Sequence, residues 1–131
     1  AIKSMKEAES YHNGPSIVNA YCPCIEHGMK GGLVNTNRAE KEAANCGYFP
    51  IFRYDPRLPK PLTLDTKTPD FNKYLDFVLS QNRYAQLSKV NPDEAERLLN
   101  NSKNDAINRY NDIIKFGTPT EEKEEDNKEV K

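Results

Sequence analysis

The chain has 131 residues, a length that fits one domain. Its 19 basic and 20 acidic side chains give a net charge of −1 and alternate along the sequence, so we expect no nucleic-acid partner. No apolar run approaches the roughly 20 residues that cross a bilayer, and the first nine residues are too charged for the core of a signal peptide. These features predict a cytoplasmic protein that binds neither nucleic acid nor membranes.

The composition is poor in core-forming residues. Hydrophobic residues make up 36% of the sequence and the mean hydropathy is −0.89, values typical of a segment that depends on a neighbour for part of its core. Residues 118–131 are mostly charged, and we predict a disordered tail there. The three cysteines include a Cys22–Cys24 pair that is too close for an unstrained disulfide, which favours a reducing compartment.

The first part of the chain predicts a helix followed by a strand. Residues 1–11 place Ile2 and Met5 on one side, as at the end of a helix. Pro15 then opens an apolar stretch over residues 16–21, where proline is tolerated as the first residue of a strand. The apolar residues there do not alternate with polar ones, which predicts a strand covered on both faces.

A helix and a second strand are expected next. Asn37 and Glu40 have the spacing of a capping box, and Gly47 is placed to end the helix in the left-handed conformation. The aromatic run over residues 48–54 contains Pro50, so it predicts an edge strand or an extended arm. Strand, helix and strand in this order predict a βαβ-like unit with a right-handed crossover.

The C-terminal half is predicted to be mainly helical. A proline-rich connector over residues 55–61 leads to a possible short strand at 62–65. A helix beginning near Phe71 either continues or bends through residues 83–87. Asn91 has the position of the next N-cap, with a second capping box to Glu94. The apolar stripe of this last helix consists of Ala95, Leu98, Leu99, Ala106, Tyr110, Ile113 and Ile114, and Gly117 and Pro119 end it.

Cys24 is the main candidate site. It ends the predicted strand, and a thiolate at a strand end is well suited to a soft metal or an iron–sulfur cluster. A cubane cluster needs about four protein ligands, so with three cysteines in this chain other polypeptide would have to complete the site. From the residues alone, the simpler interpretation is that Cys22 and Cys24 are small buried side chains.

Other arrangements are weaker candidates. Cys22, Cys24 and His27 could bind zinc, but their spacing is not that of a common structural site and a fourth ligand is lacking. The glycine-rich stretch over residues 28–32 lacks a phosphate-binding pattern, so a turn is the better interpretation. Arg53 and Arg83 could each hold an anion or a neighbouring carboxylate. No Ser-His-Asp or Cys-His arrangement supports an independent hydrolase.

A set of sequence runs adds family information. The runs are GPSIVNAYCPCIEHG (14–28), CGYFPIFRYDP (46–56), LDTKTP (64–69), RYAQL (83–87) and NPDEA (91–95). In sequence, order and spacing they resemble the C-terminal end of pyruvate:ferredoxin (flavodoxin) oxidoreductases. The resemblance extends to about Phe116. Cys22 and Phe49 depart from the family pattern, which more often has a small residue and a tryptophan at these positions.

The resemblance implies a role for Cys24. In that family a thiamine-diphosphate domain near the C-terminus carries the [4Fe–4S] cluster closest to the cofactor. Three cysteine ligands come from earlier in the chain, and the fourth matches Cys24. The resemblance does not extend this role to Cys22.

The implied activity is the oxidative decarboxylation of pyruvate with coenzyme A to acetyl-CoA. Electrons would pass through [4Fe–4S] clusters to ferredoxin or flavodoxin in a homodimeric parent enzyme that also holds thiamine diphosphate and magnesium. The family's diphosphate- and magnesium-binding motif and the other three cysteines are not among the 131 residues. We therefore expect a fragment that needs the remainder of the parent chain, and that alone is inert and binds no cofactor.

The expected fold class is α/β, or mixed α+β in isolation. Residues 1–60 would be a βαβ-like remnant of the thiamine-diphosphate and iron–sulfur domain with short strands, and residues 61–117 a C-terminal helical extension. Two alternatives remain open. The chain could be a free-standing interaction module that docks through residues 48–54 and the helices, with Cys24 merely packed. It could also be the same segment of another 2-oxoacid:ferredoxin oxidoreductase.

Overall fold

The computed structural model describes residues 1–24, 28 and 31–117. The disorder predicted for 118–131 and His27, which was considered as a zinc ligand, therefore lie outside the described residues. Five helices and one two-stranded sheet are formed in the described part. In chain order the elements are α1 (Ile2–Glu9), the 3-10 turn η2 (Leu33–Asn35), α2 (Thr36–Asn45), β1 (Phe52–Tyr54), β2 (Leu62–Leu64), the 3-10 turn η3 (Phe71–Lys73), α3 (Tyr74–Leu79), α4 (Asn82–Val90) and α5 (Pro92–Gly117).

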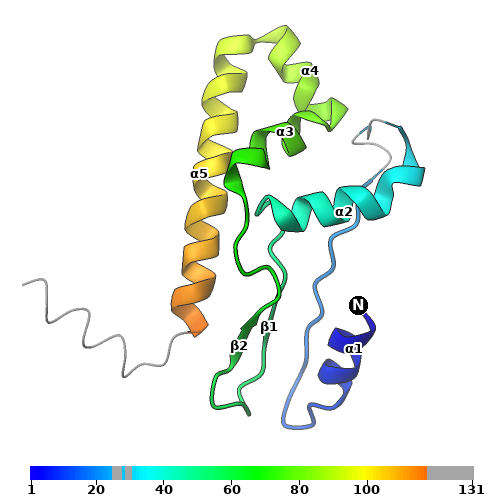
Figure 1. Ribbon diagram of the computed structural model, residues 1–131, viewed down its shortest axis with the longest axis vertical. Helices are drawn as coiled ribbons and strands as arrows, with labels where there is room; N and C mark the ends of the chain where they lie inside the picture. Colours follow the sequence, from blue (N-terminus) through cyan, green and yellow to red (C-terminus); the bar gives the residue numbers. More distant parts are fainter. Residues whose placement is uncertain (25–27, 29–30, 118–131) are drawn as a thin grey trace, which may run out of the picture.

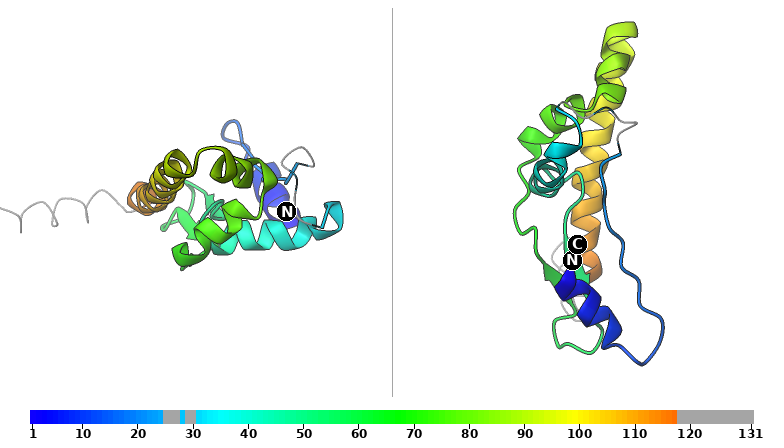
Figure 2. Two further views of the ribbon diagram at one scale, coloured as in Figure 1. Left: turned by 90° about the horizontal axis from the view of Figure 1, so that it is seen from above. Right: turned by 90° about the vertical axis from the view of Figure 1, so that its right-hand side faces the viewer.

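The long helix α5 runs along the molecule and the other elements are arranged beside it (Figure 1). Helices α3 and α4 lie against its N-terminal half, while the β1–β2 hairpin lies near its C-terminal end, where the rings of Tyr54 and Phe116 are 4.9 Å apart. Helix α1 lies beside the hairpin, and an extended segment connects it to the region of α2 at the other end (Figure 2). We call this segment, residues 12–24, the N-terminal arm.

The strand predicted over residues 16–21 is not formed. The arm is extended but pairs with no strand, and Ile17 and Val18 are 90% and 46% exposed. The described strands are β1 and β2, which pair antiparallel with Phe52 opposite Leu64 and Tyr54 opposite Leu62. The βαβ-like unit is therefore wrong for this structure. An isolated strand has no partner for its backbone groups, so apolar composition alone does not form one.

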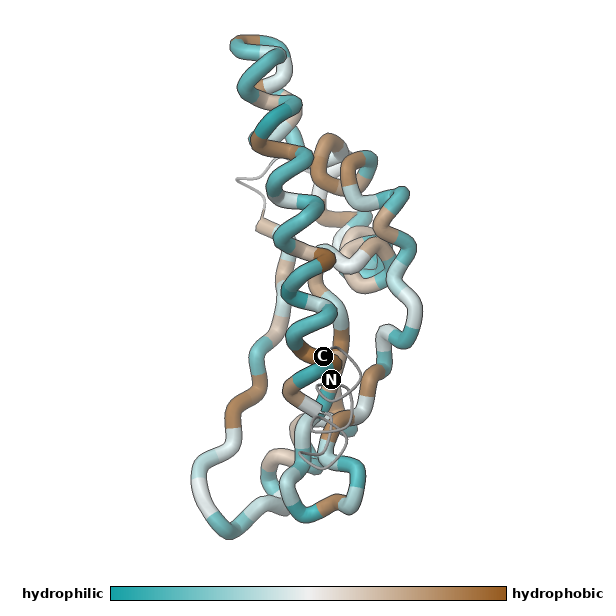
Figure 3. Tube along the Cα trace, turned by 90° about the vertical axis from the view of Figure 1, so that its left-hand side faces the viewer, coloured by the Kyte–Doolittle hydropathy of each residue, from teal (hydrophilic) through white to brown (hydrophobic). Residues whose placement is uncertain are grey.

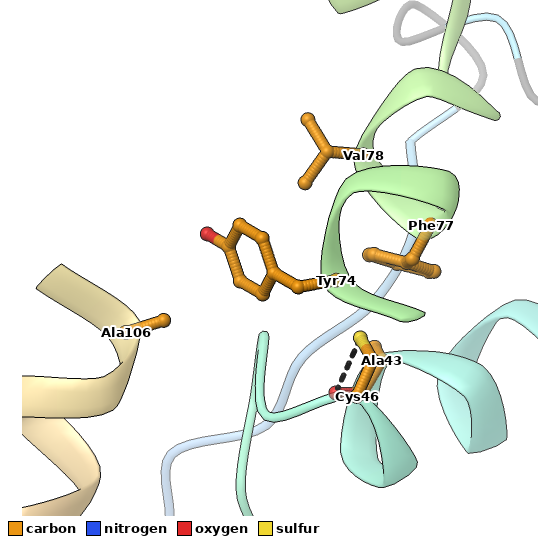
Figure 4. Packing of buried hydrophobic residues seen from close by; sticks show 6 residues of the cluster. All are labelled: Ala43, Cys46, Tyr74, Phe77, Val78 and Ala106. Carbon is orange, nitrogen blue, oxygen red and sulfur yellow. Dashed lines mark hydrogen bonds between the residues drawn. The ribbon is translucent and has the colours of Figure 1, made fainter. Parts of the chain in front are cut away.

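Hydrophobic residues lie on the arm as well as on the helices (Figure 3). The buried part is small and sits where α2, α3 and α5 meet, and it contains Ala43, Cys46, Tyr74, Phe77, Val78 and Ala106 (Figure 4). Alanine at the α2 and α5 positions lets these helices approach the aromatic rings of α3 closely. The Tyr74 hydroxyl lies 2.8 Å from the Ser102 hydroxyl, so the hydroxyl group in this cluster has a hydrogen-bond partner.

Several predicted helix ends are confirmed. Asn91 caps α5, since the backbone N–H of Glu94 donates to Asn91 Oδ1 at 3.3 Å, and Gly117 is the last residue of the helix. The second half of this capping box is wrong, because the Glu94 carboxylate accepts hydrogen bonds from Arg97 instead. Gly47 has φ 78° directly after the C-cap of α2, as predicted.

Of the other local predictions, some are confirmed and one is wrong. The capping box at Asn37 is wrong, because α2 begins at Thr36, two residues earlier than predicted, and its N-cap residue is Asn35, which makes no side-chain capping bond. The helix that begins at Phe71 bends rather than continues, since Gln81 has ψ 120° and separates α3 from α4. The short strand predicted over residues 62–65 is confirmed as β2.

Candidate functional site

The arm ends at Cys24, whose side chain is exposed. The residues just before it are attached to the helical body. Pro23 is buried, and the ring of Tyr21 stacks on Phe49 at 5.6 Å and meets the edge of Tyr48 at 5.7 Å. The Cys24 thiol therefore lies at the surface, three residues after Tyr21, whose ring is packed against Tyr48 and Phe49. No sheet holds this part of the arm.

Gly28 attaches the chain again on the far side of Cys24. The Gly28 carbonyl accepts a hydrogen bond from the backbone N–H of Asn82, the first residue of α4, at 3.1 Å. The first N–H groups of a helix have no partner within the helix. This bond therefore satisfies a donor of α4 and fixes the position of Gly28.

The other two cysteines have different surroundings. Cys22 is exposed, and its thiol lies 3.7 Å from the carbonyl of the neighbouring Pro23. Cys46 is buried in the core, where desolvation raises the pKa of its thiol and its Sγ lies 3.6 Å from the Ala43 carbonyl (Figure 4). A raised pKa keeps the thiol neutral, so Cys46 is a packing residue.

The described residues bring together no group of three His, Cys, Asp or Glu side chains that could hold a metal ion. The zinc arrangement of Cys22, Cys24 and His27 is not tested, because His27 lies outside the described residues. What the described part offers here is the exposed thiol of Cys24, with the exposed Cys22 two residues before it. Such a donor can supply one ligand of a metal or cluster site whose other ligands come from elsewhere, but it cannot form a complete site.

A groove of about 1130 Å³ lies between the arm and the rest of the molecule. Its walls are α1, the arm, residues 48–57 and side chains from α3, α4 and α5. Its aromatic wall contains Tyr21, Tyr48, Tyr74 and Tyr84. Burial, and then a hydrogen bond with Tyr84, raises the pKa of Tyr48, so the Tyr48 hydroxyl stays neutral in the ordinary pH range. The sequence analysis did not find this cluster, since its members are far apart in the sequence.

Arg53 holds carboxylates rather than a free anion. Its guanidinium donates to Glu7 on α1 at 2.7 and 2.8 Å and to Asp65, just after β2, at 2.8 and 3.0 Å. Of the two roles predicted for Arg53, the neighbouring-carboxylate role is therefore confirmed. The contact joins α1 to the hairpin.

Arg57 makes a second connection that the sequence analysis missed. It donates to Asp55 at 2.7 Å and to the Ser10 carbonyl at 2.9 Å, and its guanidinium carbon lies 5.3 Å from the centre of the Tyr11 ring. The hydrogen bonds from Arg57 lower the pKa of Asp55 to about 2. An Asp two residues before an Arg, at the start of a proline-rich turn, is the local signal that could have indicated this pair.

Comparison with known proteins gives the family. No family model matches the chain. A mitochondrial pyruvate dehydrogenase [NADP(+)] of Euglena gracilis is 40% identical over 116 residues, which is 84% of this chain and 6% of that protein. A pyruvate:ferredoxin oxidoreductase of Moorella thermoacetica is 39% identical over 119 residues, 88% of this chain. A pyruvate-flavodoxin oxidoreductase of Klebsiella pneumoniae is 36% identical over 113 residues.

These relatives share one class, since each is named as an oxidoreductase or a dehydrogenase of pyruvate. This chain is homologous to one segment of the pyruvate:ferredoxin and pyruvate-flavodoxin oxidoreductases, as the sequence resemblance predicted. It spans only 6% to 11% of the length of the curated relatives it matches. Within the described residues, no helix is long and apolar enough to cross a membrane.

Proposed function

We propose that this chain forms the segment of a pyruvate:ferredoxin or pyruvate-flavodoxin oxidoreductase that supplies one cysteine ligand to a [4Fe–4S] cluster. Cys24 is that ligand. The remainder of the parent protein supplies the other three ligands and the site for thiamine diphosphate and magnesium. The observation that carries the proposal is the exposed Cys24 thiol, held at the surface between Tyr21 and Gly28, in a chain homologous to these enzymes.

The donor chemistry supports this assignment. A thiolate is the ligand that iron–sulfur clusters use, and exposure of Cys24 leaves its sulfur free to meet a cluster that other polypeptide holds. The same feature fits poorly with the interaction-module alternative, in which Cys24 would be packed inside. Cys22 is the weaker candidate, because its thiol is directed to the adjacent Pro23 carbonyl.

The chain's own contribution is then to position the sulfur and to cover part of the parent domain. The stacked rings of Tyr21 and Phe49 fix the chain before Cys24, and the hydrogen bond to the Gly28 carbonyl fixes the chain after it. When bound, the cluster supplies one-electron transfer between the thiamine site and ferredoxin or flavodoxin. The exposed Ile17 and the groove beside the arm offer apolar surface that the remainder of the parent chain, or the second subunit of a homodimer, would cover.

The overall reaction proposed for the parent is the oxidative decarboxylation of pyruvate with coenzyme A. The alternative substrate is another 2-oxoacid, and the residues that would select between it and pyruvate lie outside this segment. The names of the relatives favour pyruvate.

A chimera tests the ligand role. The matching segment of the Moorella thermoacetica enzyme, which is 39% identical, is replaced by this chain, and Cys24→Ser is compared with the matched control Cys22→Ser. We expect Cys24→Ser to lose about four iron atoms per chain and most pyruvate-dependent electron transfer, while Cys22→Ser keeps both. Iron and acid-labile sulfide analysis on purified, correctly sized protein is the measurement. Full iron content in Cys24→Ser would contradict the proposal.

A further inference from the structure

The strongest unassigned feature is the contact between Gly28 and the start of α4. Asn82 donates its backbone N–H to the Gly28 carbonyl at 3.1 Å. Gly28 itself has φ 65°, a conformation that L side chains rarely adopt. Gly28 lies outside the helices and strands, whereas Asn82 is the first residue of α4, so the hydrogen bond joins two parts of the chain that are far apart in sequence.

The contact is also too close for any side chain at residue 28. A Cβ placed on Gly28 would lie 2.8 Å from both the Cβ and the Nδ2 of Asn82. Gly32 differs in this respect, since its φ is 72° but nothing lies within 4 Å of an added Cβ. Residue 28 therefore needs glycine for both backbone conformation and close approach, whereas residue 32 needs it for conformation alone.

The contact lies four residues after Cys24 and so restricts the position of that cysteine. Four residues of chain span at most about 14 Å, so fixing Gly28 limits how far Cys24 can move. Tyr21, three residues before Cys24, is fixed by its rings against Phe49 and Tyr48. Both anchors are on the helical body, so the thiol is held from both sides although the arm pairs with no strand.

We propose that Gly28 and Asn82 are positioning residues that restrain Cys24 through the hydrogen bond from the Asn82 N–H to the Gly28 carbonyl. That this restraint holds Cys24 in place for a cluster rests on the proposed function. The restraint itself is a property of the chain alone. Both residues act by fixing the segment that carries the thiol.

The experiment uses a nitroxide spin label on Cys24 of the whole 131-residue chain, in a Cys22→Ala background where Cys46 is buried. The main comparison is Asn82→Pro against Asn82→Ala. Proline at the first position of a helix lacks the N–H but is otherwise well tolerated, and the preceding Gln81, with φ −89° and ψ 120°, already has the backbone that proline requires. Asn82→Ala keeps the donor and is the matched control.

We expect Asn82→Pro to lose the slow-motion component of the spin-label spectrum and Asn82→Ala to keep it, with equal thermal midpoints for the two variants. Gly28→Ala against Gly32→Ala is the second pair, and the slow component should be lost only in Gly28→Ala. A purely structural role would lower the thermal midpoint and leave the label spectrum unchanged. Identical spectra for Asn82→Pro and Asn82→Ala would overturn the proposal, even if Gly28→Ala fails to fold.

This outcome is separable from a failure of the ligand assignment. If Cys24 is not a ligand, the Cys24→Ser chimera keeps its iron, whatever the label spectra are. If the restraint is absent, the label spectra coincide while the Cys24→Ser chimera still loses iron.

Discussion

Gly47 illustrates how one residue serves both local and tertiary structure. It follows α2 with φ 78°, which ends the helix in the way the sequence predicted. The ring of Phe71 also lies against it, because a Cβ at residue 47 would be 2.3 Å from Cε1 of that ring. The Phe71 ring meets Tyr110 of α5 at 6.0 Å, so this glycine helps connect α2 to α5.

We expect Gly47→Ala to lower the free energy of unfolding by about 2–5 kcal/mol. The left-handed backbone contributes about 1–2 kcal/mol, and displacement of the Phe71 ring contributes about 1–3 kcal/mol more. Urea unfolding followed by circular dichroism measures the change. The matched control is Gly14→Ala, where the closest atom to an added Cβ is 3.8 Å away and φ is not positive. Equal unfolding midpoints for the two variants would contradict this account.

At the scale of elements, α1 depends on polar contacts. It has 8 residues and none of them is buried. A helix of this length is unstable in water by itself. Arg53 and Arg57 bind Glu7 and the Ser10 carbonyl, so these two arginines of the hairpin region hold the helix in place.

We expect Glu7→Gln to speed hydrogen exchange of the α1 amides and to leave those of α5 unchanged. The substitution removes the charge that accepts two hydrogen bonds from Arg53, at 2.7 and 2.8 Å. Glu9→Gln, on the same helix at an exposed position, is the matched control and should exchange like the unmodified chain. The idea fails if the two variants exchange alike.

The hairpin loop offers a test by titration. The Asp55 carboxyl, which accepts hydrogen bonds from Arg57, should titrate with a pKa of about 2. A pKa lowered by folding means that the interaction stabilises the loop above the ordinary pKa of 3.8 and is lost as the pH falls from there through about 2. Carboxyl chemical shifts measured by NMR follow this titration. In Arg57→Gln the pKa should return toward 3.8, and an unchanged value would show that Arg57 is not the cause.

At the scale of the whole molecule, the exposed surface contains many apolar side chains. Those on α1 and the arm are Ile2, Met5, Ile17 and Val18, with exposures from 46% to 90%. The groove beside the arm is lined in part by Ile17 and Val18. A surface of this kind is expected where other polypeptide covers it.

We expect the isolated chain to bind less than one [4Fe–4S] cluster per chain when treated anaerobically with iron and sulfide. The reason is that the described residues bring no third potential ligand to any site, while a cubane needs about four. Visible absorbance together with iron analysis on the monomer peak of a sizing column is the measurement. A stoichiometric cubane on the monomer would contradict the expectation that other polypeptide completes the site.

The sequence predicted most helices well, for a physical reason. The Asn91 cap, the Gly47 terminus and the apolar period of α5 are all local features, and helical hydrogen bonds join residues four apart in one segment. The predicted capping box at Asn37 failed because α2 begins at Thr36, before that residue, and the one at Glu94 failed because a competing local bond was available. For Glu94 the competitor is Arg97, three residues away.

The sequence by itself determined the helices, the short strand β2 and the identity of Cys24 as the cysteine to examine. Only the tertiary structure decided that residues 16–21 form an exposed arm, that Arg53 joins α1 to the hairpin, and that Gly28 is fixed on α4. A strand needs hydrogen-bond partners from another segment, and an arginine needs a carboxylate brought from elsewhere. Such partners are supplied by folding, so periodicity and spacing do not reveal them.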